Sequence, residues 1–128
     1  MENRLAAFQA RRAELNDKVM ATDHLGIKRF WNLDTRCYED GALPARTKEL
    51  LGLVASMVLR CDDCIDYHVV KCVEAGFSDA ELWDALNVGL VVGGSIVIPH
   101  LRHAVESVEL ARRLPGAAPD ETPIPVPT

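Results

Sequence analysis

The chain lacks the features that would direct it to nucleic acid or to a membrane. Its 128 residues carry a formal net charge of −5, and its Lys and Arg residues are scattered with no basic run. An acidic chain of this kind is a poor partner for a phosphate backbone or an anionic lipid surface. The longest apolar stretch covers only residues 85–98, whereas a membrane-spanning helix needs about 20 apolar residues. We therefore expect no nucleic-acid partner and no membrane partner.

The start of the chain also has no apolar run. Residues 1–5 read Met-Glu-Asn-Arg-Leu, which does not resemble the apolar region of a secretory signal peptide. We therefore expect a cytoplasmic protein. The four cysteines are then more typical of thiols, redox groups or metal ligands than of a structural disulfide framework.

No segment shows the period-two alternation of a half-buried strand, and no internal repeat is visible. Apolar residues recur instead at helical spacing, so the sequence predicts an all-α fold of about six helices. Gly76 suits a helix stop, Ser78 with Glu81 forms a capping box, and Ser95 is a candidate cap for the last helix. We expect the helices over residues 2–22, 27–38, 45–59, 61–75, 79–93 and 96–113.

The length fits a single domain, which we place at residues 1–114. The tail at 115–128 holds five of the seven prolines and no periodic apolar pattern, so we expect it to be disordered. Two runs, residues 50–59 and 88–98, have too few polar positions for the surface of a monomer. Burial of these runs against another subunit predicts a homo-oligomer.

The most informative pattern is Cys61-Asp-Asp-Cys64 followed by His68. Residues three, four and seven apart return to one face of a helix, so Cys61, Cys64 and His68 form one stripe. A helix start favours a thiolate, and His68 lies one turn after Cys64, where it can accept the thiol proton. We interpret the aspartates at 62, 63 and 66 as a solvated face. Glu49 is the last charge before a buried run, and a helical hairpin would bring it back near His68.

Glu49, Cys61-x-x-Cys64 and His68, at these separations, resemble the motif of alkyl hydroperoxidase D, the redox branch of the carboxymuconolactone decarboxylase family. The resemblance covers residues 42–113. It implies a helical fold with the dithiol at the N-terminus of a central helix, and assembly as trimers or hexamers. It also implies that the dithiol reduces hydroperoxides and is recycled by a thiol or lipoyl donor, with no cofactor or metal. By position, Cys64 would attack the peroxide, Cys61 would resolve, and His68 and Glu49 would relay protons. Asp63 stands where the redox branch often has a histidine.

Three alternatives to this interpretation remain open. One is decarboxylase or lactone chemistry on the same fold, which needs no dithiol. Another is a non-enzymatic helical oligomer stabilised by a disulfide or a metal. The third is zinc held by Cys61, Cys64 and His68, with Cys72 or Glu49 as a fourth ligand, although structural sites usually take their ligands from separate elements.

Four further residues are secondary candidates. We interpret Cys72 as a buried hydrophobe and Cys37 as a structural or partly exposed thiol. Tyr67 and His100 are candidates for the wall of the active cavity.

Overall fold

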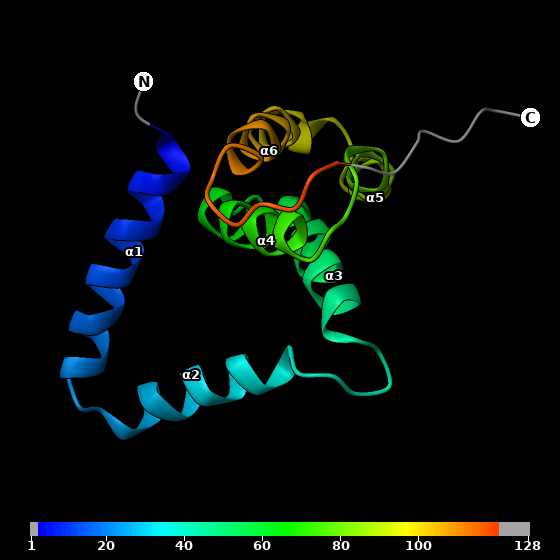
Figure 1. The fold of residues 1–128 in the computed structure, drawn as a ribbon. Helices are drawn as coiled ribbons and strands as arrows, with labels where there is room; N and C mark the ends of the chain where they lie inside the picture. The colour runs from blue at the N-terminus through cyan, green and yellow to red at the C-terminus, as the bar shows by residue number, and fades with distance from the viewer. Residues whose placement is uncertain (1–2, 121–128) are drawn as a thin grey trace, which may run out of the picture. The chain divides into compact units, whose positions relative to one another are not determined.

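The computed structural model describes residues 3–120, and this part of the chain contains helices and no strands (Figure 1). The predicted all-α fold of six helices is therefore confirmed. The elements are α1 (Arg4–Ala21), α2 (Leu25–Cys37), α3 (Ala45–Val58), α4 (Asp62–Glu74), α5 (Asp79–Gly93), the short 3₁₀ helix η1 (Ser95–Val97) and α6 (Ile98–Ala111). Among the described helices, none is both long enough and apolar enough to cross a membrane.

The chain divides into two compact units, residues 1–45 and 46–128, where the sequence predicted one domain over 1–114. The first unit holds α1 and α2, whose first turns are capped by Asn3 and His24 respectively. The helix α2 buries none of its residues, and its Phe30 and Leu33 are exposed. The second unit contains most of residues 42–113, the part of the chain that carries the sequence resemblance.

The core of the second unit is built around α4, which packs most extensively against α6 (Figure 1). One face of α4 supplies Ile65, Val69 and Val73, all essentially inaccessible to solvent. The fully buried residues opposite them come from α3, α5, η1 and α6: Leu53, Met57, Leu82, Leu86, Val97, Ala104 and Val108. This core fixes α4 from several sides, so side chains at its N-terminus have a rigid base.

Gly89 allows α3 and α5 to approach closely. A Cβ atom at this position would lie 2.8 Å from Met57 Cε and 3.2 Å from Val54 Cγ1. The first of these contacts is too short and the second is tight, so a larger residue would require the Met57 and Val54 side chains to shift.

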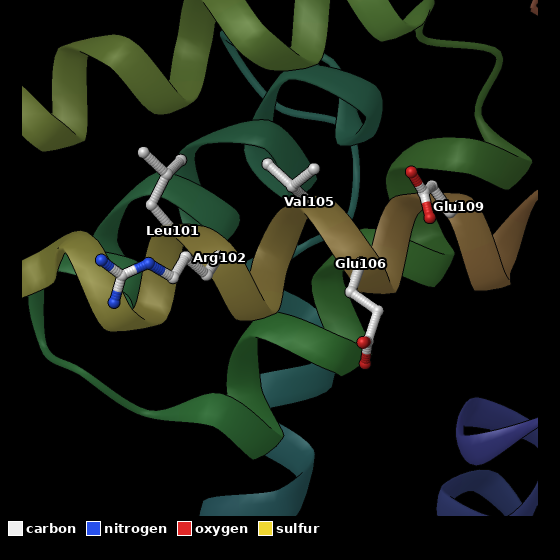
Figure 2. A pocket seen from close by; sticks show the side chains of 5 residues that line it. All are labelled: Leu101, Arg102, Val105, Glu106 and Glu109. Atoms are coloured by element: carbon white, nitrogen blue, oxygen red, sulfur yellow. The ribbon is translucent and has the colours of Figure 1, made fainter.

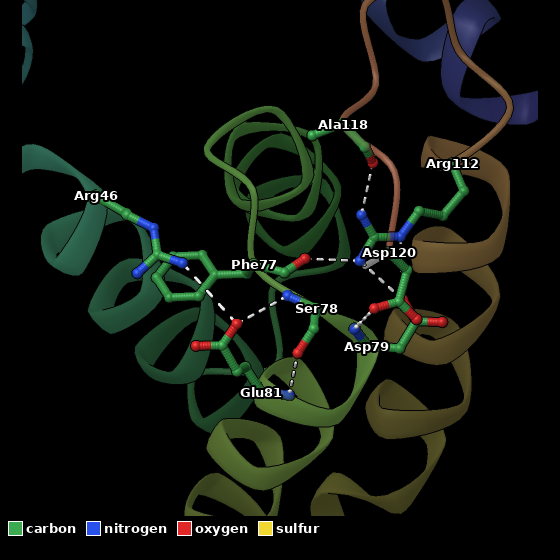
Figure 3. Close-up of polar contacts among 8 residues, drawn as sticks. All are labelled: Arg46, Phe77, Ser78, Asp79, Glu81, Arg112, Ala118 and Asp120. Carbon is green, nitrogen blue, oxygen red and sulfur yellow. Dashed lines mark hydrogen bonds and ion pairs between the residues drawn. The ribbon is translucent and has the colours of Figure 1, made fainter. Parts of the chain in front are cut away.

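The turn between α4 and α5 is held by hydrogen bonds among its own residues and by two arginines from other parts of the second unit (Figure 3). Gly76 takes the left-handed conformation, at φ +88°, that ends the helix. Ser78 Oγ accepts from Glu81 N at 3.1 Å, and Glu81 Oε1 accepts from Ser78 N at 3.0 Å. The predicted Gly stop and capping box are thus both present.

The two arginines hold this turn from opposite sides (Figure 3). The Arg46 guanidinium of α3 lies 3.7 Å from the centre of the Phe77 ring and donates to Ala75 O at 3.2 Å. Arg112, just after α6, donates to Phe77 O at 2.7 Å and to Asp79 Oδ1 at 2.8 Å. The turn is therefore connected to both α3 and α6.

The start of the tail is hydrogen bonded to the same turn. Arg112 Nη1 donates to Ala118 O at 2.9 Å, and Asp79 N donates to Asp120 Oδ1 at 3.2 Å. Two residues of the tail, Ala118 and Asp120, therefore make hydrogen bonds, whereas we expected residues 115–128 to be disordered. The remainder of that tail, residues 121–128, lies outside the described residues.

Ser95 does not cap the last helix as expected. It begins η1, and α6 starts at Ile98 with no side-chain cap. Pro99 fills the first turn of α6, where a missing N–H costs nothing. The proline therefore permits a helix start that needs one fewer capping acceptor.

Candidate active site

The two cysteines lie at the N-terminus of α4, as predicted. Cys61 is the N-cap residue in extended conformation, and its Sγ accepts from Cys64 N at 3.3 Å. Arg60, in the left-handed region at φ 61°, turns the chain into this position. Cys61 is half-buried and Cys64 is exposed. Both thiols thus sit on one turn, with Cys64 open to a substrate.

The pKa of Cys64 is raised to about 11. Burial of the thiol is the largest cause, followed by its hydrogen bond to Cys61 and the charges of Cys61 and Asp63; a backbone N–H acts in the opposite direction. The expectation that the helix start would favour the Cys64 thiolate is therefore wrong. The N–H contribution is outweighed chiefly by burial of the thiol, with further contributions from Cys61 and Asp63.

Glu49 and His68 meet, as the helical hairpin predicted. His68 Nδ1 lies 2.8 Å from Glu49 Oε2, and the side chains are only 9% and 14% exposed. A carboxylate in this place accepts the Nδ1 proton, which leaves Nε2 as the basic nitrogen of the neutral ring. The pair joins α3 to α4 one turn beyond Cys64.

Tyr67 contacts this pair from the side. Its ring meets that of His68 edge to face, with centres 5.0 Å apart. Lys71 Nζ lies 5.7 Å from the centre of the Tyr67 ring. Tyr67 therefore contacts the imidazole directly, and its place on the wall of an active cavity stays a prediction.

A second set of Asp–His contacts joins α4 to α6. Asp62 Oδ1 lies 2.7 Å from His100 Nδ1, and Asp66 Oδ1 lies 2.9 Å from His103 Nε2. Ser107 Oγ donates to the same Asp66 oxygen at 2.5 Å. The interpretation of Asp66 as solvated is wrong, since its side chain is 5% exposed. Positions 62 and 66 share one helix face, and positions 100, 103 and 107 share another, but no local pattern in the sequence shows that these two faces meet.

The remaining two cysteines are not part of the dithiol turn. Cys72 is fully buried, and burial together with the charge of Glu49 raises its pKa to about 12, against a lowering by Arg46. Cys37 is exposed in the first unit, and all four cysteines are free thiols. Within residues 3–120, no three His, Cys, Asp or Glu side chains converge as a metal site would require. The zinc alternative therefore has no ligand set in this part of the chain.

A hollow of about 410 Å³ lies along α6 (Figure 2). It is lined by Leu101, Arg102, Val105, Glu106 and Glu109. None of the sequence-predicted site residues belongs to this lining. The lining residues of the hollow therefore include no member of the dithiol, of the Glu49–His68 pair or of the Asp–His contacts between α4 and α6.

The described residues combine an all-helical fold with two cysteines on one helix turn, one turn from a buried carboxylate–histidine contact. The chain belongs to the carboxymuconolactone decarboxylase family, whose model matches residues 27–107, more than half of its length. The match spans both helices that carry Glu49, the two cysteines and His68.

Solved structures agree with this assignment. A family member from Thermotoga maritima, for which a role in the antioxidative response has been suggested, is 58% identical, with a TM-score of 0.79 over 83% of this chain and 90% of that chain. The apo form of a family protein from Legionella pneumophila has a TM-score of 0.77 at 22% identity, over 84% of this chain and 96% of that chain. The second likeness concerns the fold alone.

Two curated relatives are more distant. An uncharacterized protein of Cupriavidus necator is 30% identical over 56 residues, which are 44% of this chain and 50% of that protein. Uncharacterized protein 4 of the cox locus of Paracoccus denitrificans is 28% identical over 76 residues, 59% of this chain and 68% of that protein. The chain thus matches about half the length of the first of these relatives.

Proposed function

We propose that the protein is a thiol-dependent hydroperoxide reductase that uses Cys61 and Cys64 as its dithiol. The observation that carries this proposal is the buried Glu49–His68 contact of 2.8 Å, one helical turn from an exposed cysteine that shares its turn with another. A buried carboxylate is costly to desolvate, and a hydrogen bond from the His68 ring offsets part of that cost. Its location beside two thiols is readily explained by a need to move protons there. The role suggested for the Thermotoga relative supports the same chemistry.

The reaction needs two thiol protons and two electrons. In the first step, Cys64 loses its proton and attacks one oxygen of the O–O bond. The bond breaks, Cys64 becomes a sulfenic acid, and the other oxygen leaves as an alcohol after taking up a proton. In the second step, Cys61 attacks the Cys64 sulfur, a disulfide forms, and the hydroxyl leaves as water. Overall, two thiols and one hydroperoxide give one disulfide, one alcohol and one water.

The raised pKa of Cys64 explains why a base is needed. With a pKa of about 11, this thiol is almost entirely protonated near neutral pH, so its thiolate must be formed as it reacts. His68 Nε2 is the proton acceptor in our proposal, and it returns that proton to the departing alkoxide. Glu49 keeps the ring in the required tautomer and stabilises the imidazolium that forms.

The oxidised protein must then be reduced again. The proposed donor is a small dithiol or a lipoyl-type group, which attacks the Cys61–Cys64 disulfide by thiol–disulfide exchange and leaves as its own disulfide. A cytoplasmic location is part of this proposal, because that compartment maintains the reduced donors that the cycle consumes. The whole cycle requires no metal and no bound cofactor.

Hydroperoxide consumption tests the proposal directly. We expect the full chain to consume an organic hydroperoxide in the presence of dihydrolipoamide, and Cys64→Ser to abolish the activity. Cys37→Ser is the matched control, because Cys37 is an exposed cysteine of α2 and is not one of the proposed site residues. Mass spectrometry of protein treated with peroxide alone should show the loss of two hydrogens, mapped to Cys61 and Cys64.

Two results would contradict this function. One is oxidation of Cys37 or Cys72 while Cys61 and Cys64 stay reduced. The other is a wild-type protein that consumes no hydroperoxide with any dithiol donor but converts a lactone or carboxylated substrate. In that case the Cys64→Ser variant would convert the same substrate equally well. The second result would establish the decarboxylase alternative, since that chemistry does not require a thiol.

A further inference from the structure

The helix α6 presents a row of proton-carrying side chains to α4 that the mechanism above does not use. His100, His103 and Ser107 occupy successive turns of α6, and each contacts an aspartate of α4. Asp62 lies between the two histidines, at 2.7 Å from His100 Nδ1 and 3.9 Å from His103 Nδ1. These four ionisable groups, two on each helix, face one another across the α4–α6 contact.

The two ends of this row differ in their exposure to solvent. Asp66 is buried and accepts from both His103 and Ser107, so this end is a fixed clasp between the helices. Asp62 and His100 are 47% and 23% exposed respectively. The two ends thus differ in the exposure of their aspartates, since Asp66 is 5% exposed and Asp62 is 47% exposed, while His100 and His103 are both 23% exposed. The two hydrogen bonds to Asp66 hold α6 in register, and the carboxylate of Asp62 is in contact with water.

The position of Asp62 connects this end to the dithiol. Asp62 is the residue directly after Cys61, the N-cap of α4, whereas His68 follows Cys64 by one turn. The aspartate whose charge acts on Cys64 is Asp63, and not Asp62. We propose that Asp62 and His100 form a second proton relay, which serves Cys61, so that each thiol of the pair has its own carboxylate–histidine base. This inference rests on the proposed dithiol function.

The relay has a defined place in the reaction. After the hydroperoxide has oxidised Cys64 to a sulfenic acid, Cys61 must lose its proton before its sulfur can attack. His100 accepts that proton while Asp62 stabilises the imidazolium. The Cys61–Cys64 bond then forms, the S–O bond of the sulfenic acid breaks, and His100 gives the proton to the leaving hydroxide, which departs as water.

A crossed alkylation experiment separates the two relays without using a hydroperoxide. Cys61 is followed in a Cys64→Ser background and Cys64 in a Cys61→Ser background, with the modified cysteine identified by peptide mass spectrometry. Each background receives either His100→Gln or His68→Gln, and alkylation by iodoacetamide is measured from neutral to alkaline pH. We expect His100→Gln to raise the apparent pKa of Cys61 and leave that of Cys64 unchanged. His68→Gln should do the reverse. Each unit of change slows alkylation near neutral pH about tenfold.

Two controls distinguish a relay from a loss of structure. His24→Asn removes a histidine from the first unit but keeps a good helix cap, and it should leave both thiols unchanged. Added imidazole should restore the alkylation rate of Cys61 in His100→Ala, because a free base can replace a missing relay but cannot repair a misplaced helix.

Each outcome decides for or against the relay. Equal slowing of both thiols by His100→Gln, no effect on Cys61, or failure of imidazole to restore the rate would each overturn it. If the crossed pattern is found but the wild type consumes no hydroperoxide, the proposed function fails and the relay remains. If hydroperoxide is consumed but the crossed pattern is missing, the relay fails and the proposed function remains.

Discussion

At the scale of the residue, the dithiol turn is electrostatically unfavourable for a thiolate at Cys64. Cys61 contributes both a hydrogen bond and a charge that raise the pKa of Cys64, and Asp63 contributes a smaller charge effect. Two negative sulfurs cannot share one turn at low cost, so ionisation of one thiol opposes ionisation of the other. The turn is thus arranged for sequential loss of its two protons.

Removal of these neighbours should lower the pKa of Cys64 from about 11. We expect Cys61→Ser to lower it most, since it removes both Cys61 effects while Ser still caps α4. Asp63→Asn should lower it less. A lower pKa means more thiolate near neutral pH, so the alkylation of Cys64 should become faster there in both variants. Alkylation rates against pH check this, and the same or a slower rate in Cys61→Ser would contradict it.

Glu49 and His68 should act as one unit on the reacting thiol. General-base assistance contributes about 10²- to 10⁴-fold to a rate, so His68→Ala should reduce hydroperoxide turnover near neutral pH by an amount in that range. Glu49→Gln removes the carboxylate charge from the 2.8 Å contact and should give a similar or smaller loss. Because either change disables the same relay, the double variant should be little worse than the worse single one. Steady-state turnover with a dithiol donor is the measurement; independent, multiplying losses would show two separate roles.

At the scale of the element, Ser78 and Ser95 both look like helix caps in the sequence, but only one of them caps a helix. Ser78 caps α5 through a reciprocal pair of hydrogen bonds and is almost fully buried. Ser95 makes no capping bond and lies in η1. Only the first of them satisfies backbone N–H groups that would otherwise have no acceptor.

Ser78→Ala should therefore lower the free energy of unfolding by about 1 kcal/mol, within a range of about 0.5–2. Ser95→Ala, the matched control, should change it by much less, because surface substitutions that remove no such contact are usually within about 0.5 kcal/mol. Urea denaturation followed by far-UV circular dichroism provides both values. Equal losses in the two variants would mean that the capping box has no special part in stabilising α5.

The helices and the Glu49–His68 contact could be predicted from sequence because they follow from local rules. Capping residues, glycine stops and helical spacing act over a few positions, and the hairpin of α3 and α4 brings Glu49 back by simple geometry. The burial of Asp66 and its contacts with His103 and Ser107 depend on how α6 lies against α4, which no local pattern specifies. The raised pKa of Cys64 likewise results from a balance of burial against an N–H donor, and that balance depends on the three-dimensional packing around the thiol.

At the scale of the whole molecule, the single chain leaves much apolar surface in contact with water. The exposed residues include members of both runs that are too apolar for a monomer: Leu51, Leu59, Val88, Val91, Val92 and Ile96. Monomeric proteins rarely expose apolar side chains in such concentration without a partner for them. The family resemblance implies a trimer or hexamer, and a second copy of the chain is the partner that we propose for this surface.

We therefore expect the protein to be a homo-oligomer whose mass in solution is a multiple of 14.1 kDa. Val91 and Val92 are 76% and 72% exposed at the C-terminal end of α5, and burial of one valine side chain contributes about 1.5–3 kcal/mol. Val92→Lys places a charge where that burial would occur, so it should lower the measured mass at a given concentration. Asn87→Lys adds the same charge at an exposed polar position of the same helix and should leave the mass unchanged. Light scattering at micromolar concentration distinguishes these results. A wild-type mass equal to one chain would show that these apolar residues are covered in some other way or not at all.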